Sequence, residues 1–270
     1  RMSLIEFILI CFSILVLYCI LRYFWELIPV NGILSYKWRK GAIFITGCDT
    51  GFGRLLAVKC AMHGIPTYAG CLTEQAKEIL KDETKQLAHV LTPLSLDVRN
   101  NSSVREAFRF LENDLVKKKE NLWALVNNAD GLQRELDEYG VTCSIIEPGI
   151  FRTSITDSER IRHQIYTKWN EIPDSIKEQY GEEYKHRFIS HATTHMEQNA
   201  SDCVEWVVDA YFHAITARYP RLRYRCGWDS LIVFTLLSIL PTGLGDAVYK
   251  ALTHGNGRPI PAMLMKKNKT

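Results

Sequence analysis

The stretch that decides the fold is Thr46-Gly47-Cys48-Asp49-Thr50-Gly51-Phe52-Gly53. An apolar run, 42–45, precedes it, and a segment of helical composition, 54–62, follows it. A glycine turn between a strand and a helix is the context that a dinucleotide-binding fingerprint requires. The first glycine permits a sharp turn, and the other two let the backbone approach a pyrophosphate at the helix N-terminus. The sequence therefore predicts an α/β fold with a doubly wound, Rossmann-like parallel sheet.

The chain downstream of this turn alternates between strand-like and helix-like segments, which is typical of doubly wound folds. We expect a helix that is capped by Ser102 or Ser103, with Glu106 completing a capping box, and that runs to about Lys118. The other expected elements are strands at 67–72, 89–96 and 122–126, a helix at 74–88 and an amphipathic helix at 201–217.

The glycine spacing Gly-x-x-x-Gly-x-Gly resembles the cofactor motif of the short-chain dehydrogenase/reductase family. Asn127-Asn128-Ala129, after the predicted strand 122–126, resembles a second element of that family, and 147–153 resembles its Pro-Gly-x-x-x-Thr loop over the nicotinamide. Asp97 matches an adenine-contacting Asp-Val pair, although a strand-end turn carboxylate is an equal alternative. The resemblance implies an NAD or NADP site formed by Thr46, Gly47, Cys48, Thr50, Gly51, Phe52, Gly53, Asp97, Val98, Asn127, Asn128, Ala129, Pro148, Gly149 and Thr153.

The end of the second predicted strand bears on the choice of cofactor. An acidic residue there would bind a ribose 2′-OH, whereas an arginine would suit a 2′-phosphate. The sequence reads Cys71-Leu72-Thr73-Glu74, so the acid comes one or two places late and no arginine is present. This pattern favours NAD over NADP.

The family pattern is interrupted after Ala129. A helix with a catalytic Asn, a strand ending in a catalytic Ser and a helix bearing Tyr-x-x-x-Lys should follow, but 132–141 already resembles the end of that last helix. A strand–helix–strand unit takes about 30 residues, so on the order of 60 residues are missing. No tyrosine downstream of the fingerprint has a lysine four places later. We therefore assign no catalytic residue.

The interruption leaves the order of the sheet to be settled. We predict that 141–146 pairs in parallel beside 122–126, in the place of the missing strand. A short helix capped by Asp130 and ended by Gly140 would connect them. The predicted fold is thus a Rossmann-like sheet shortened by the internal gap.

The N-terminus is almost wholly apolar from Leu4 to Leu21, with Glu6 as its only charge. Extended to Trp25, it gives about 22 residues, enough to cross a bilayer core of roughly 30 Å. A cleaved signal peptide is the less favoured alternative, because no small-x-small cleavage site follows. We expect a single membrane anchor at 1–28, in the endoplasmic reticulum membrane, and a basic linker at 29–41.

The remaining segments complete the expected organisation. The predicted cofactor domain spans 42–226, with a helical substrate lobe at 154–199, and a membrane-associated segment at 227–250 precedes a tail at 251–270. The ten uncharged residues 231–240 suit either a membrane-dipping segment or a buried helix. Arg221–Asp229 resembles the retinol dehydrogenase and 17β-hydroxysteroid dehydrogenase branch of the family, which implies a retinoid or steroid substrate.

Composition narrows the possible functions further. The net charge of +3 is too balanced to indicate nucleic-acid binding, and the eight cysteines form no Cys-x-x-Cys pair, so we expect no metal site. A homodimer is compatible with the family, although the gap would weaken it. Two hypotheses remain. The first is an oxidoreductase with a displaced acid/base. The second is a catalytically dead variant, which is either a nucleotide-binding protein or an unstable splice product.

Overall fold

The computed structural model describes residues 41–126 and 141–254, together with three isolated positions at 13, 17 and 21. The predicted anchor, apart from those positions, and the predicted connecting helix at 130–140 lie outside the described residues. Within the described part of the chain, no helix combines the length and the apolar character needed to cross a bilayer.

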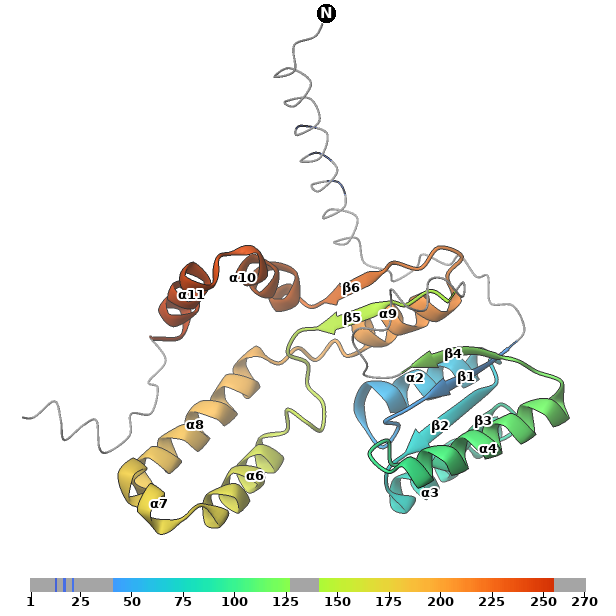
Figure 1. Ribbon diagram of the computed structural model, residues 1–270, viewed down its shortest axis with the longest axis horizontal. Coiled ribbons are helices and arrows are strands. Elements are labelled where there is room, and N and C mark those ends of the chain that lie inside the picture. The colour runs from blue at the N-terminus through green and yellow to red at the C-terminus, as the bar shows by residue number, and fades with distance from the viewer. Residues whose placement is uncertain (1–12, 14–16, 18–20, 22–40, 127–140, 255–270) are drawn as a thin grey trace, which may run out of the picture.

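A four-stranded parallel sheet forms the centre of the fold (Figure 1). Its strands are β1 (Ala42–Ile45), β2 (Thr67–Cys71), β3 (Leu91–Ser95) and β4 (Leu122–Val126), in the order β3-β2-β1-β4. The expected Rossmann-like α/β fold with a parallel sheet is confirmed.

Helices cover both faces of this sheet. Side chains alternate along a strand, so Ile43 and Ile45 pack on one face against α2 (Gly51–Met62), while Ala42 packs on the other against α4 (Asn101–Lys118). The first face also carries α3 (Glu74–Glu83) and α9 (Glu205–Thr216) through the buried residues Leu80, Val208, Phe212 and Ile215.

Several predicted boundaries are wrong for local reasons. The helix α3 stops at Glu83, because Thr84 leaves helical geometry with φ of −110° and ψ of 26°, and a 3₁₀ turn, Lys85–Leu87, follows. The strand β3 begins at Leu91 rather than at 89. It contains Pro93, which lacks an N–H and is tolerated because β3 is an edge strand of the described sheet.

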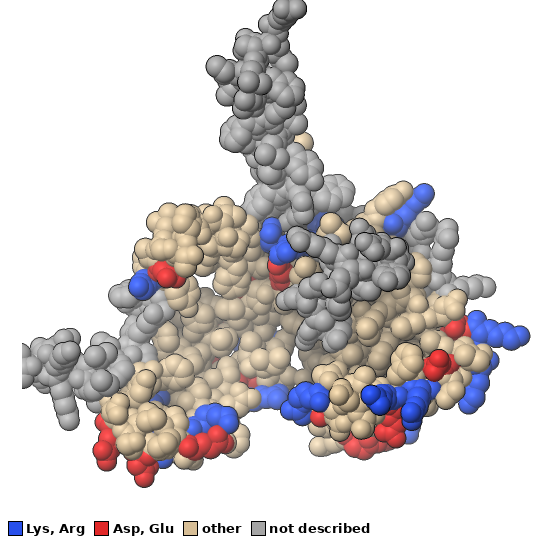
Figure 2. Space-filling model, in the orientation of Figure 1, with Lys and Arg blue, Asp and Glu red and all other residues tan. Residues whose placement is uncertain are grey.

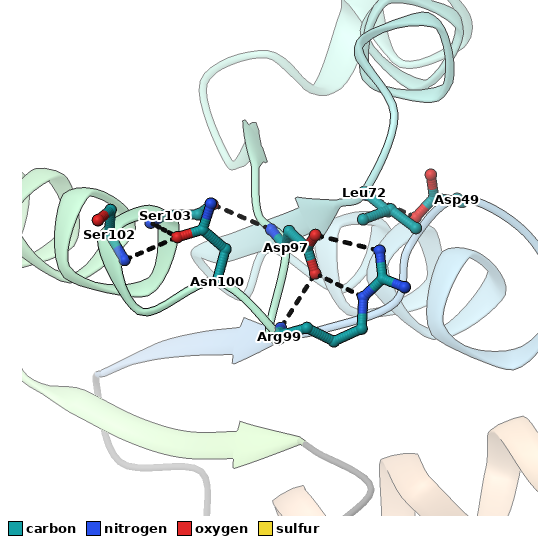
Figure 3. A network of polar contacts seen from close by, with 7 residues as sticks. All are labelled: Asp49, Leu72, Asp97, Arg99, Asn100, Ser102 and Ser103. Atoms are coloured by element: carbon teal, nitrogen blue, oxygen red, sulfur yellow. Dashed lines mark hydrogen bonds and ion pairs between the residues drawn. The ribbon is translucent and has the colours of Figure 1, made fainter.

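The predicted cap of α4 is also wrong. The N-cap is Asn100, whose Oδ1 accepts from the backbone N–H groups of Ser102 and Ser103 at 2.9 and 3.5 Å. Ser103 has a different role, since its Oγ accepts from the backbone N–H of Asp97 at 3.0 Å. Ser103 thus ties the first turn of α4 to the segment that follows β3, next to the cavity described below (Figure 3).

The predicted pairing of 141–146 with β4 is contradicted. The strand β5 begins later, at Ile145–Pro148, and pairs in parallel with β6 (Arg223–Cys226) in a separate two-stranded sheet. A buried cluster holds this pair against α9, and it consists of Phe151, Val207, Ala210, Tyr224 and Cys226. Moving β5 to β4 would break these contacts, so the four-stranded sheet ends at β4 within the described residues.

The remaining helices extend from these two sheets. The predicted lobe consists of α6 (Ser158–Glu171), α7 (Asp174–Tyr180) and α8 (Glu182–Asn199), and Figure 1 shows it projecting away from the four-stranded sheet. After β6 come a π-helix, η2 (Asp229–Phe234), then α10 (Thr235–Ile239) and α11 (Thr242–His254). The helix predicted at 201–217 starts only at Glu205.

Candidate functional site

A cavity of about 410 Å³ opens at the carboxyl ends of the strands. Its walls include Thr46, Leu72 and Leu96, which directly follow β1, β2 and β3, and Val126, the last residue of β4. In this sheet β1 lies between β2 and β4, so the chain order reverses there, and such a switch point is where open α/β sheets bind ligands. The other lining residues are Gly47, Asp49, Thr50, Gly51, Phe52, Gly53, Leu56, Asp97, Val98, Arg99, Thr153, Ser154, Ile155 and Tyr211.

A side chain is disfavoured at each glycine of the turn, for reasons that differ between the positions. Gly47 and Gly51 have φ values of +70° and +66°, a region that side chains disfavour. A Cβ on Gly53 would lie only 2.5 Å from the Gly47 carbonyl oxygen, so this glycine lets α2 pack closely on the turn. The sharp turn predicted at Gly47 is confirmed, and Gly51 shares it, whereas the approach of Gly51 and Gly53 to a pyrophosphate stays a prediction.

The start of α2 is suited to an anion. In the described structure its N-cap, Thr50, makes no side-chain capping bond, and no acidic residue stands in the first turn. The first N–H groups and the helix dipole therefore face the cavity without an internal carboxylate. The chain's own residues thus fit a pyrophosphate.

Asp49 is the site residue that the sequence analysis passed over. Its Oδ2 accepts from the backbone N–H of Leu72 at 2.8 Å (Figure 3). Its Oδ1 accepts from the backbone N–H and the hydroxyl of Thr73 at 2.9 and 3.0 Å. The carboxylate thus stands at the end of β2, where a dinucleotide site needs an acid. The expected candidate, Glu74, instead accepts from the Ser95 hydroxyl at 2.6 Å and pairs with Lys77.

Asp97 and Val98 line the cavity as expected, but the Asp97 carboxylate already has a partner. Its Oδ1 accepts from the Arg99 backbone N–H at 3.0 Å and from Nε at 3.1 Å, while Oδ2 accepts from Nη2 at 3.2 Å. These bonds to Arg99 lower the pKa of the Asp97 carboxyl. The group is therefore ionised at neutral pH and acts as an acceptor.

The loop after β5 closes the other side of the cavity. Thr153 lines it, and the Ser154 and Thr50 hydroxyls lie 2.6 Å apart. The rings of Phe52 and Phe151 meet edge to face at 6.0 Å, which joins the glycine turn to this loop. Pro148 and Gly149 stand at the end of β5 and do not line the cavity themselves.

Cys48 points away from the cavity. Its side chain is fully buried, and its thiol donates to the Ile45 carbonyl oxygen at 3.3 Å. Burial raises the pKa of this thiol far above its usual range, so the group stays protonated and acts in packing. Asn127, Asn128 and Ala129 fall outside the described residues.

The described residues supply no evident acid/base for hydride chemistry. Tyr211 lines the cavity, but burial raises the pKa of its phenol, which is opposite to what a general base requires. One Tyr-x-x-x-Lys spacing does occur, at Tyr36 and Lys40, but it precedes the glycine turn and lies outside the described residues. No three potential metal ligands gather in the described ranges.

The fold and the cavity together define a Rossmann-type α/β protein with a glycine turn at the switch point of its sheet. The short chain dehydrogenase profile matches residues 41–134. A 17-beta-hydroxysteroid dehydrogenase type 6 from Rattus norvegicus is 31% identical, over 86% of this chain and 93% of the relative. Human retinol dehydrogenase 16 is 28% identical over 86% and 93%. The chain belongs to the short-chain dehydrogenase/reductase family, in its retinol and 17β-hydroxysteroid dehydrogenase branch.

Solved structures agree on the fold. A short-chain dehydrogenase/reductase from Burkholderia phymatum in complex with NAD has a TM-score of 0.52 at 15% identity, covering 75% of this chain and 94% of its own. A short-chain dehydrogenase from Streptomyces avermitilis has a TM-score of 0.50 at 14% identity, with 80% and 99% covered.

The alignment length bears on the interruption in the sequence. The match to the rat relative runs over 307 positions, whereas 86% of 270 residues is about 232. The difference, 307 − 232, leaves about 75 positions without a counterpart in this chain. The size of this deficit agrees with the loss of two strand–helix units.

Proposed function

We propose that this chain binds a nicotinamide dinucleotide and transfers hydride weakly or not at all. The cavity is the observation that supports the proposed nucleotide binding. A glycine turn, an open helix N-terminus and residues from the ends of all four strands converge on it. The loss of catalysis follows from the sequence, which has no Tyr-x-x-x-Lys after the glycine turn to take or give the proton.

The cofactor that we propose is NAD rather than NADP. The Asp49 carboxylate, held at the end of β2 by Leu72 and Thr73, can accept from a ribose 2′-OH and would repel a 2′-phosphate. Two cations lie near this carboxylate, and each already pairs with an acid. Arg99 bonds to Asp97 through two of its guanidinium nitrogens, and Arg54, whose Nη1 donates to the Asp49 carbonyl oxygen at 3.2 Å, pairs with Glu83. The charge balance therefore favours NAD.

The relatives' names suggest the substrate, and the surface suggests the location. We propose that any residual substrate is a retinoid or steroid, and that the protein resides on the endoplasmic reticulum membrane. The surface over η2, α10 and α11 carries few charges (Figure 2). Its exposed apolar side chains, which would suit contact with lipid, are Ile232, Phe234, Leu236, Ile239 and Leu244.

Calorimetric titration of the full chain in detergent with NAD and with NADP tests the binding and the preference. We expect NAD to bind more tightly, and Asp49→Asn to reduce the ratio of the two affinities about tenfold. The matched control is Asp82→Asn, an exposed carboxylate on α3 that pairs with Lys85 and does not line the cavity. Binding of neither nucleotide would refute the proposal, and an unchanged ratio would refute the role of Asp49.

A further inference from the structure

The carboxylate of Asp229 reaches from the first residue of η2 to the loop after β5. Its Oδ2 accepts from the backbone N–H of Ile150 at 2.6 Å, although the two residues are 79 positions apart. Its Oδ1 accepts from the backbone N–H of Ser230 at 2.9 Å. One side chain thus links the start of the C-terminal helices to the segment that leads into the cavity.

Two glycines make room for this carboxylate. A Cβ on Gly149 would overlap it, and a Cβ on Gly227 would lie 2.6 Å from Oδ1. Gly227 also has φ of +98°, which a side chain would strain. The Pro-Gly of the loop and the Gly-Trp-Asp that follows β6 are therefore two halves of one arrangement.

Neighbouring bonds fix the same loop from the same side. The backbone N–H of Gly149 donates to the Cys226 carbonyl oxygen at 2.8 Å, and the Ser230 hydroxyl donates to the Glu147 carbonyl oxygen at 2.8 Å. The backbone from Glu147 to Ile150 is thus held by the end of β6 and the start of η2. Four residues beyond Gly149, Thr153 lines the cavity.

We propose that Asp229 is a positioning residue for the loop 148–153, which the family resemblance places over the nicotinamide of the cofactor. It holds the loop 148–153 through the Ile150 amide, and so makes the geometry of that loop depend on the attachment of the C-terminal helices. This inference rests on the proposed nucleotide binding. It assigns Asp229 no contact with the cofactor and no part in a chemical step.

The test compares two ligands on the full chain in detergent. NAD carries the nicotinamide, whereas ADP-ribose lacks it and keeps the adenosine and pyrophosphate. We expect Asp229→Asn to weaken NAD binding about fivefold and ADP-ribose binding by less than about twofold, because the bond lost is the one to the Ile150 amide, whereas the contacts of Phe151 and Ser154 with the glycine turn remain. The control is Asp246→Asn, an exposed carboxylate on α11, which should change neither affinity.

The outcomes separate the inference from its foundation. If the unmodified chain bound neither ligand, the proposed function would fall, and this inference with it. If it bound both and Asp229→Asn weakened both equally or neither, Asp229 would be a structural residue and the inference alone would be wrong. Should that variant fail to fold, Ser230→Ala removes a second anchor of the same loop. It should weaken NAD about twofold with ADP-ribose unchanged, and equal changes would overturn the inference.

Discussion

The two strands that border the interruption are less buried than the strands behind them. All five residues of β2 are buried, but β4 exposes Leu122, Trp123 and Leu125 at 42, 42 and 57%. Likewise, no residue of β5 is buried, while Tyr224 and Cys226 of its partner β6 are. The sequence of β4, Leu-Trp-Ala-Leu-Val, is typical of a strand covered on both faces. The exposure therefore marks where the missing strand and its helices would pack.

The helix α9 explains why the two sheets stay in place despite the interruption. On one side it packs on α2 in the main core, and on the other it carries the cluster beneath β5 and β6. It also accepts, through the Ile215 carbonyl oxygen, a 2.9 Å hydrogen bond from the Trp123 indole of β4. Because α9 contacts both sheets, closing the gap would require the core to be repacked.

Insertion of the missing segment from a relative, between Ala129 and Asp130, should have the largest effect. We expect retinol or steroid oxidation with NAD to rise at least about 100-fold, because the segment supplies the acid/base residues. The measurement is NADH formation by membranes that carry each form. Equal turnover by the two forms would show that the chemistry lies elsewhere.

A matched pair of leucine truncations should separate the buried strands from the exposed one. Leu91→Ala on β3, where the side chain is 2% exposed, should lower the free energy of unfolding by about 2–4 kcal/mol. Leu125→Ala on β4 should lower it by less than about 1 kcal/mol, because this side chain is already more than half exposed. Urea denaturation measures both, and similar losses would mean that β4 is covered in solution.

The smallest expected effect is a pH dependence confined to the two-stranded sheet. His213 on α9 lies 2.8 Å from the Tyr224 hydroxyl of β6, which itself accepts from the Arg221 backbone N–H at 2.9 Å. The tautomer of the neutral imidazole determines whether Nδ1 accepts from the tyrosine hydroxyl or donates to it. Burial, with the Arg221 charge as a second cause, lowers the pKa of His213 in the folded chain.

The sign of this dependence follows from linkage. The unfolded chain takes up the proton first, so the contribution of His213 is complete above about pH 6.5 and is lost as the pH falls below that value. We expect amides of β6 to exchange faster at pH 5.5 than at pH 7.5, after correction for intrinsic rates, with β1–β3 unchanged. His213→Gln should abolish the difference, whereas His163→Gln, exposed on α6, should keep it. Equal acceleration in both sheets would show that they unfold as one unit.

The sequence by itself determined the elements whose cause is local. The glycine turn was predictable because the requirement for positive φ at Gly47 and Gly51, and for close packing at Gly53, acts within eight residues. The resemblance to the family rested on this stretch together with two further local motifs, at 127–129 and 147–153. The cap of α4 was not predictable, since Asn100, Ser102 and Ser103 are all good capping residues and only the geometry distinguishes them.

Only the tertiary structure decided which distant segments meet. Sequence spacing suggested that β5 would slide beside β4, but the buried cluster against α9 outweighs the short connection and keeps β5 beside β6. The tertiary structure also placed the Asp49 carboxylate at the end of β2, 23 residues along the chain. It likewise brought the Asp229 carboxylate to the backbone of the loop after β5. Such contacts depend on how helices and strands pack in three dimensions, and local residue patterns do not predict which distant segments will meet.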